Sequence, residues 1–245
     1  MTRLFGLIGK PLAQSFSKKY FTEKFEREDI SNTAYELFQL ESIDEFPGLL
    51  ERHTNFCGIN VTIPYKREVM QYLHEVDETA RAIGACNCIK VENGKLTGYN
   101  TDAPAFKASL LPLLQPYHNK ALVLGTGGAA QAVVFILQQL GISYKYVSRK
   151  VGEGMFGYDD LTPDIMQEYL LIINTTPLGS FPKVEDCARI PYEYLTNRHY
   201  LYDLVYNPAV TRFLQNGLDK GASIKNGYDM LVAQAELGWE IWSRK

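Results

Sequence analysis

Cysteine is scarce in this 245-residue sequence, and the four that occur (Cys57, Cys86, Cys88 and Cys187) follow no regular spacing. Cys86 and Cys88, separated by one residue, match neither a zinc-binding spacing nor the C-x-x-C redox pair. Four unpatterned cysteines do not make a disulfide scaffold. We therefore expect reduced cysteines packed as small hydrophobic side chains in a cytoplasmic protein, with no metal site.

The sequence also lacks an excess of charge of one sign and a long apolar run. Lys and Arg number 25 against 28 Asp and Glu, a formal net charge of −3, which argues against broad binding to nucleic acid or anionic membranes. No apolar run approaches the roughly 20 residues that cross a bilayer, and the first residues do not resemble a secretory signal. The default expectation is an intracellular enzyme.

Short apolar strands alternate with helical segments along the chain, which is typical of α/β architecture. We predict strands over 4–9, 56–62, 88–91, 96–99, 121–124, 144–147, 170–173 and 200–204, and helices over 17–28, 66–83, 128–140 and 229–242. Asn93-Gly94 indicates a hairpin between the third and fourth strands. Residues 111–116, with two prolines, interrupt regular structure, so we place a domain boundary near Ala103.

A glycine-rich turn, Gly125-Thr126-Gly127-Gly128-Ala129, joins an apolar strand to a helix. This is the context of a dinucleotide-binding fingerprint, in which the helix N-terminus presents free N–H groups to a pyrophosphate. A purely structural turn is the alternative for a lone glycine motif. The flanking strand, helix and next β-unit favour nucleotide binding.

The residues after the next strand indicate which nucleotide is bound. Where an NAD enzyme carries an acidic residue for the ribose hydroxyls, this chain has Ser148-Arg149-Lys150, a set that suits the 2′-phosphate of NADP(H). The alternative is a solvated basic turn. Asn174-Thr175-Thr176 follows another apolar strand and places polar groups at the ligand-binding edge of such a sheet.

The first half of the chain carries the candidates for chemistry. Asn60 and Thr62 alternate with apolar residues and point to one side of a strand. Lys66 follows at the first turn of a predicted helix, where a cation opposes the helix dipole, and such local violations concentrate at functional sites. A plain surface lysine is the alternative, and by itself the commoner one.

Further polar residues occur at predicted strand ends and on the last helix. Asn87 and Asp102 belong to the first group, although Asp102 could simply cap a helix. Gln234 interrupts a predicted apolar stripe formed by Met230, Leu237 and Ile241. A buried amide needs partners, which a polar ligand could supply.

These motifs, in this order, resemble the shikimate/quinate dehydrogenase family over nearly the whole chain. The matching segments are Leu7-Ile8-Gly9-Lys10-Pro11 with Gln14-Ser15-Phe16-Ser17, Gly58-Ile59-Asn60-Val61-Thr62-Ile63-Pro64-Tyr65-Lys66, Gly84-Ala85-Cys86-Asn87, Asn100-Thr101-Asp102, the glycine turn, Asp203-Leu204-Val205-Tyr206-Asn207-Pro208, and residues 226–234.

The resemblance implies NADPH-dependent, reversible reduction of 3-dehydroshikimate to shikimate in aromatic amino-acid biosynthesis. Lys66 and Asp102 would be the catalytic pair. Ser15 and Ser17 would hold the substrate carboxylate, and Asn60, Thr62, Asn87, Tyr206 and Gln234 would bind or orient its hydroxyls. Leu204, Gly227 and Met230 would border the nicotinamide.

The implied fold has an N-terminal α/β substrate domain (1–103 plus 222–245) and a Rossmann-type NADP-binding domain (104–221). The C-terminal helix returns to the first domain. The implied partner is a small-molecule substrate, with no nucleic acid or membrane, in a monomer or homodimer. The chain departs from the family pattern at Gln14, Lys18 and Ala103, and residues 152–158 do not resemble the usual helix.

Two alternatives remain at this stage. One is an NAD-accepting quinate/shikimate dehydrogenase, against which the serine pair and the basic turn argue. The other is a non-catalytic NADP-binding sensor on the same fold. The presence of both Lys66 and Asp102 argues against a sensor, because a binding protein needs no proton donor.

Overall fold

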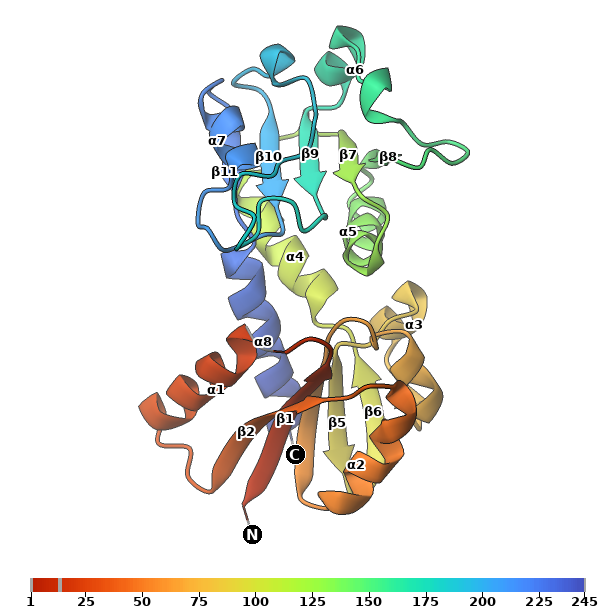
Figure 1. Cartoon of the computed structure of the whole chain (residues 1–245), viewed down its shortest axis with the longest axis vertical. Helices are drawn as coiled ribbons and strands as arrows, with labels where there is room; N and C mark the ends of the chain where they lie inside the picture. The colour runs from red at the N-terminus through yellow and green to blue at the C-terminus, as the bar shows by residue number, and fades with distance from the viewer. Residues whose placement is uncertain (1, 13–14, 245) are drawn as a thin grey trace. The chain divides into compact units, whose positions relative to one another are not determined.

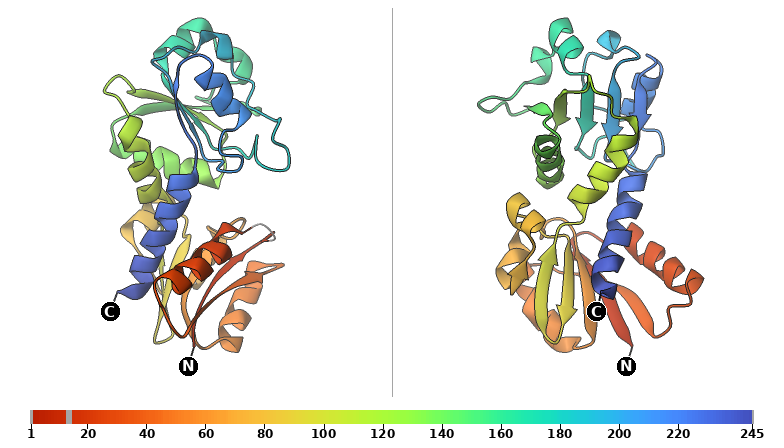
Figure 2. Two further views of the ribbon diagram at one scale, coloured as in Figure 1. Left: turned by 90° about the vertical axis from the view of Figure 1, so that its left-hand side faces the viewer. Right: turned by 180° about the vertical axis from the view of Figure 1, so that it is seen from behind.

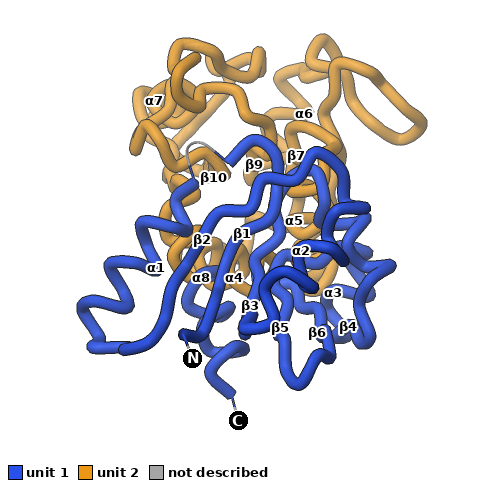
Figure 3. Tube along the Cα trace, turned by 60° about the horizontal axis from the view of Figure 1, so that its bottom comes forward, with its two compact units in different colours: residues 1–101, 234–245 blue, residues 102–233 orange. Residues whose placement is uncertain are grey.

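The computed structural model describes residues 2–12 and 15–244 and divides the chain into two compact units (Figures 1 and 3). Unit 1 comprises residues 1–101 and 234–245, and unit 2 comprises residues 102–233. The sequence predicted that the cofactor-binding domain ends at residue 221, whereas unit 2 extends to residue 233. The difference arises because β11 (Ser223–Lys225) pairs in parallel with β10 (Tyr200–Asp203), which keeps this segment in unit 2. The last helix, α8 (Tyr228–Ser243), ends in unit 1, which confirms the predicted return.

Unit 1 is built on a six-stranded mixed sheet in the order β2-β1-β3-β5-β6-β4. Its strands are β1 (Arg3–Gly9), β2 (Thr33–Gln39), β3 (Phe56–Val61), β4 (Glu75–Val76), β5 (Cys88–Glu92) and β6 (Lys95–Tyr99). The predicted hairpin between β5 and β6 is confirmed. Asn93 and Gly94 turn it with φ of 50° and 77°, the positive angles that a two-residue hairpin turn of this kind requires.

Successive side chains of β1 enter two separate apolar cores, as the two-residue period of a strand dictates. Leu4 and Ile8 pack on the side of α2 (Phe46–Arg52). Phe5 and Leu7 pack with α1 (Phe16–Arg27) and the end of α8. A short 3₁₀ turn, Ile43–Glu45, precedes α2. The sheet of unit 1 is therefore covered on both faces.

The predicted helix over 66–83 is wrong. The chain instead makes a turn through Lys66, a 3₁₀ helix (Glu68–Tyr72), the edge strand β4 and the short helix α3 (Glu78–Ile83). The Asp77 carboxylate caps α3 by accepting the Ala80 N–H at 2.8 Å. Val69 of the 3₁₀ helix packs in the core around Ile59 and Ile89, and the apolar residues of β4 and α3 continue the same period in separate elements. Lys66 is therefore not in a helix, and the dipole argument for it does not hold.

Unit 2 contains a five-stranded parallel sheet in the order β11-β10-β9-β7-β8. The other strands are β7 (Lys120–Leu124), β8 (Ser143–Val147) and β9 (Leu171–Asn174), and the helices are α4 (Asp102–Leu110), α5 (Gly128–Gln139), α6 (Pro163–Glu168) and α7 (Arg212–Leu218). Single 3₁₀ turns occur at Leu111–Leu113, Tyr158–Asp160 and Tyr192–Tyr194. Helices α4 and α7 lie on opposite faces of the sheet (Figure 2).

The strand order of unit 2 reverses at β7, which has β8 on one side and β9 on the other. Ligands of open α/β sheets bind at the carboxyl ends of the strands at such a switch point. The glycine turn follows β7 directly, so the sheet topology and the glycine motif indicate the same place. In the described residues 2–12 and 15–244, no helix is long and apolar enough to span a membrane.

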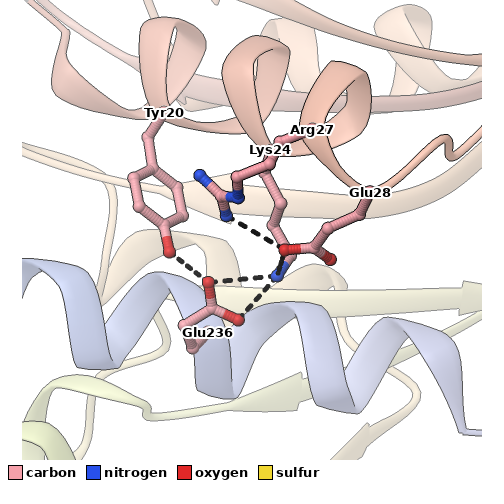
Figure 4. A network of polar contacts seen from close by, with 5 residues as sticks. All are labelled: Tyr20, Lys24, Arg27, Glu28 and Glu236. Carbon is pink, nitrogen blue, oxygen red and sulfur yellow. Dashed lines mark hydrogen bonds and ion pairs between the residues drawn. The ribbon is translucent and has the colours of Figure 1, made fainter.

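A network of charged and phenolic side chains joins α1 to α8 within unit 1 (Figure 4). The Lys24 side chain is only 5% exposed, and its ammonium lies 2.8 Å from the Glu236 carboxylate and 3.0 Å from that of Glu28. The Tyr20 hydroxyl also donates to Glu236. Burial by itself would lower the pKa of Lys24, but the hydrogen bonds to the two carboxylates outweigh burial and raise it.

We predict that Lys24→Met lowers the free energy of unfolding by about 2 kcal/mol, between the values for exposed and fully buried ion pairs, because Glu236 loses its cation. Lys19→Met on the same helix is the matched control, since Lys19 is exposed and lies 3.8 Å from Glu23; it should change stability by less than about 0.5 kcal/mol. Denaturant unfolding measures both. Equal stability of the two variants would contradict this role for Lys24.

Candidate active site

Three strand ends in unit 1 bring buried polar side chains together. Asn60 lies on β3, Asn87 precedes β5 and Thr101 follows β6. The Asn87 amide donates to the Thr101 hydroxyl at 2.9 Å and accepts the Thr101 N–H at 2.7 Å. The Asn60 amide donates to the Asn87 carbonyl at 3.3 Å. Because buried amides must be paired, these bonds fix the position of all three residues.

The segment of residues 85–87 also holds the backbone at Lys66 and the two residues before Asp102, all within unit 1. The Cys86 N–H donates to the Lys66 carbonyl at 2.7 Å, and the Asn100 amide donates to the Ala85 carbonyl at 2.9 Å. Asp102 follows Thr101 directly and begins α4. The turn that bears Lys66 and the peptide that leads into Asp102 are thus held by the same three residues.

The two predicted carboxylate-binding serines lie at the start of α1. Ser15 is its N-cap residue but makes no capping bond, and its hydroxyl oxygen is buried without a hydrogen-bond partner among the residues described. Leaving a buried hydroxyl unpaired is unfavourable, so this oxygen suits a polar ligand. Lys18, a departure from the family pattern, makes an ion pair with Glu36 at 2.7 Å, and Gln14 lies outside the described residues.

Thr62 and Gln234 lie at the border of the same cluster. Thr62 follows β3 and is half-buried, with its N–H donated to the Ile8 carbonyl at 2.9 Å. The predicted apolar stripe on the last helix is offset by about one residue: the buried positions of α8 are Ala235, Gly238, Ile241 and Trp242. Gln234 is half-buried, one turn before Gly238, which packs against Asn60. Residues four apart lie on one side of a helix, so Gln234 is on the side of α8 that faces this sheet.

The glycine turn of unit 2 has the conformation that anion binding requires. Gly125 has a φ of 97°, and a side chain there would meet Thr176 at 2.9 Å. Gly127 is the N-cap of α5 and adds no capping side chain. A Cβ at Gly127 or Gly128 would meet no atom within 4 Å. The first N–H groups of this 12-residue helix are therefore exposed and open to an anion.

A basic pocket of about 810 Å³ lies beside the glycine turn, lined by Thr126, Ser148, Arg149, Lys150, Val151, Gly152 and Met155. Gly152 and Met155 come from residues 152–158, the segment that departs from the family pattern. This segment turns back toward β8 because Phe156 bridges to Val147 and accepts the Ser148 N–H at 3.0 Å. The predicted nucleotide-selecting residues thus line one pocket within unit 2.

Asn174 and Asp203 form a buried, hydrogen-bonded pair at the carboxyl ends of β9 and β10. Asn174 is fully buried, and its amide donates to the Asp203 carboxylate at 2.9 Å while accepting the Thr176 hydroxyl at 2.6 Å. The other Asp203 oxygen accepts the Thr211 hydroxyl at 2.6 Å. Both amide atoms of Asn174 are engaged, so its geometry supports a positioning role, whereas Thr175 and Thr176 are partly exposed.

The sequence analysis includes Asp203 in a motif but assigns it no role, although an acidic residue that ends an apolar strand is a recognisable signal. It also accepts the Val205 N–H at 3.0 Å. Burial raises the pKa of Asp203 to about 6, while its three hydrogen bonds act in the opposite direction. Asp203 therefore holds the start of the loop that follows β10.

The remaining predicted cofactor residues meet at that loop. A side chain at Gly227 would lie 2.2 Å from the Leu204 carbonyl oxygen, so only glycine allows this close approach. The Gly227 N–H donates to the Val205 carbonyl at 3.1 Å. Tyr206 and Met230 are half-buried, and burial raises the pKa of the Tyr206 hydroxyl.

The fold and these sites define a two-unit α/β protein of the dinucleotide-dependent dehydrogenase type. Residues 7–89 match the family model described as the shikimate dehydrogenase substrate binding domain. A shikimate dehydrogenase (NADP(+)) of Clostridium beijerinckii is 39% identical, over 97% of this chain and 91% of that protein. The chain belongs to the shikimate dehydrogenase family.

Solved structures agree with this assignment. Shikimate 5-dehydrogenase of Thermus thermophilus, in complex with NADP(H) and shikimate, superposes with a TM-score of 0.85 at 29% identity, over 99% of this chain and 94% of that one. Quinate dehydrogenase of Corynebacterium glutamicum, in complex with NAD, has a TM-score of 0.87 over 99% of this chain and 94% of that one. Its 24% identity supports the fold alone.

We predict that Asp203 makes the stability of unit 2 depend on pH. Its pKa in the folded chain, about 6, lies above the ordinary aspartate value of 3.8, so its contribution is fully present below pH 3.8 and is lost as the pH rises through 6. The free energy of unfolding should fall relative to that of Asp203→Asn by about 2 kcal/mol between pH 4 and pH 7. Denaturant unfolding at both pH values measures the difference; parallel pH curves would contradict it.

Proposed function

We propose that this chain is an NADP-dependent shikimate dehydrogenase, which interconverts 3-dehydroshikimate and shikimate in aromatic amino-acid biosynthesis. Family membership supports the reaction. The observation that carries the assignment of the catalytic pair is the link through residues 85–87, which holds the backbone of Lys66 and the peptide before Asp102. Relatives that match nearly the whole chain bear the name shikimate dehydrogenase (NADP(+)).

Lys66 has the chemistry that ketone reduction requires. NADPH, when bound, supplies the hydride to the carbonyl carbon. Negative charge then develops on the carbonyl oxygen, and a positioned ammonium stabilises that charge and donates a proton to it. In the reverse direction the neutral amine of Lys66 accepts the proton from the substrate hydroxyl. Asp102, the second member of the proposed pair, would balance the charge of the lysine.

The substrate would bind among the polar side chains of unit 1. The unpaired Ser15 hydroxyl, with Ser17, suits the carboxylate of shikimate. Asn60 and Asn87 each direct one amide hydrogen to the protein and have a second one that can reach a substrate hydroxyl. Thr62 and Gln234, together with Tyr206, would contact the remaining hydroxyls.

The cofactor would bind along the carboxyl edge of the sheet in unit 2. The exposed N–H groups of residues 127–129 suit the pyrophosphate, with Thr126 beside them. Arg149 and Lys150, with Ser148, suit the 2′-phosphate in the 810 Å³ pocket. Thr175, Thr176, Leu204, Gly227 and Met230 would lie toward the nicotinamide, with Asn174 supporting them from behind.

The alternatives differ in cofactor and in catalysis. An NAD-accepting quinate/shikimate dehydrogenase binds a cofactor without the 2′-phosphate, so it does not need Arg149 and Lys150 in the pocket. A non-catalytic sensor transfers no proton, so it does not need Lys66. A cytoplasmic location and a monomeric or homodimeric state stay predictions from the sequence.

Replacement of the proposed proton donor tests the mechanism. Lys66→Ala should lower kcat for shikimate oxidation by roughly 10²–10⁴-fold and change KM for shikimate much less, because the ammonium acts mainly in the transition state. Steady-state kinetics measure both values. Lys95→Ala, which removes an exposed lysine paired with Glu75 in the same unit, is the control and should retain normal turnover. A near-normal kcat in Lys66→Ala would remove this lysine from the mechanism.

A second substitution tests the cofactor. Arg149→Ala should raise KM for NADPH by roughly tenfold or more and leave KM for NADH nearly unchanged, because the guanidinium contacts only the 2′-phosphate. Initial rates with each cofactor at saturating 3-dehydroshikimate give the comparison. Equal effects on NADPH and NADH would refute the 2′-phosphate assignment.

A further inference from the structure

Tyr35 is a buried tyrosine of unit 1 to which the sequence motifs assign no role. It lies on β2, and only 3% of it is exposed. Its ring stacks on that of Phe21, with centroids 4.7 Å apart and an interplanar angle of 14°. This packing fixes the ring and therefore the position of the hydroxyl at its end.

The Tyr35 hydroxyl holds one of the proposed substrate-binding residues. It donates to the Asn60 side-chain oxygen at 2.7 Å. Burial raises the pKa of Tyr35 well above its ordinary value, so the donor proton is retained.

These bonds determine what Asn60 presents to a ligand. With its side-chain oxygen occupied by Tyr35, the amide nitrogen must face the Asn87 carbonyl. The Asn60 side chain therefore has one orientation, and its second amide hydrogen points in a fixed direction. Because Asn87 in turn holds Thr101, a continuous set of hydrogen bonds runs from Tyr35 to the residue before Asp102.

We propose that Tyr35 is a positioning residue for the substrate, which orders Asn60 before binding. The proposal rests on the substrate-binding role given to Asn60 above. Prior ordering of binding groups lowers the entropic cost of association. The expected consequence is tighter substrate binding with little effect on the chemical step.

Another buried tyrosine shows that such an arrangement is not required for packing alone. The Tyr65 hydroxyl donates to the backbone carbonyl of Leu40 at 2.7 Å. A backbone acceptor satisfies a buried hydroxyl without involving any side chain. The Tyr35 hydroxyl instead bonds to the side chain of Asn60, a residue of the candidate substrate site.

Tyr35→Phe tests the proposal because it removes the hydroxyl and keeps the stacked ring. We expect KM for shikimate, and the calorimetric Kd for shikimate, to rise about five- to tenfold, the effect of one lost hydrogen bond. We expect kcat to change less than about threefold and KM for NADP⁺ to stay unchanged. Tyr192→Phe, which deletes a half-buried hydroxyl that donates to the Ala188 carbonyl in unit 2, is the control and should leave all four values unchanged.

A double-mutant cycle separates positioning from general stability. In an Asn60→Ala background, Tyr35→Phe should raise KM for shikimate by less than about twofold further, because its main partner is already absent. An unchanged KM and Kd in the single variant, or the same factor in both backgrounds, would overturn the proposal. If the unsubstituted chain reduces NADP⁺ with shikimate, such a result refutes the role of Tyr35 and leaves the proposed function intact. If the unsubstituted chain neither turns over nor binds shikimate, both fail.

Discussion

The requirement that buried amides be paired shapes the candidate site of unit 1. Asn60 and Asn87 are buried at strand ends. An apolar side chain there would need no hydrogen bond, whereas each buried amide must find partners. Their bonds join β3, β5 and the segment after β6. Since the Cys86 N–H in the same segment holds the Lys66 carbonyl, the proposed proton donor depends on a short set of hydrogen bonds rather than on a helix.

In unit 2 the constraint is that the strands of the parallel sheet are apolar. A parallel sheet with helices on both faces has apolar strands, so the polar groups that contact a cofactor must come from the residues after each strand. The Asp203 carboxylate supplies the internal support at this edge by accepting bonds from Asn174, Val205 and Thr211. The glycine turn and the basic pocket provide the exposed contacts.

Strongly patterned elements could be predicted from the sequence, and context-dependent ones could not. Apolar strands such as 121–124 and the Asn93-Gly94 hairpin have local causes, and both are confirmed. The helix predicted over 66–83 is wrong because the apolar residues of three successive short elements follow the same period as one helix. The site motifs were visible as polar residues at strand ends. Tyr35 was not, because a tyrosine in a strand gives the same sequence pattern whether its hydroxyl bonds to the backbone or to a site residue.

The central claim is that this chain oxidises shikimate with NADP⁺ through Lys66. The most direct measurement follows the absorbance of reduced nicotinamide while the purified chain is given shikimate or quinate with NADP⁺ or NAD⁺. The account predicts rapid NADP⁺ reduction with shikimate, a much slower reaction with the other combinations, and its loss in Lys66→Ala. An absence of shikimate-dependent reduction, or a preference for quinate with NAD⁺, would contradict it.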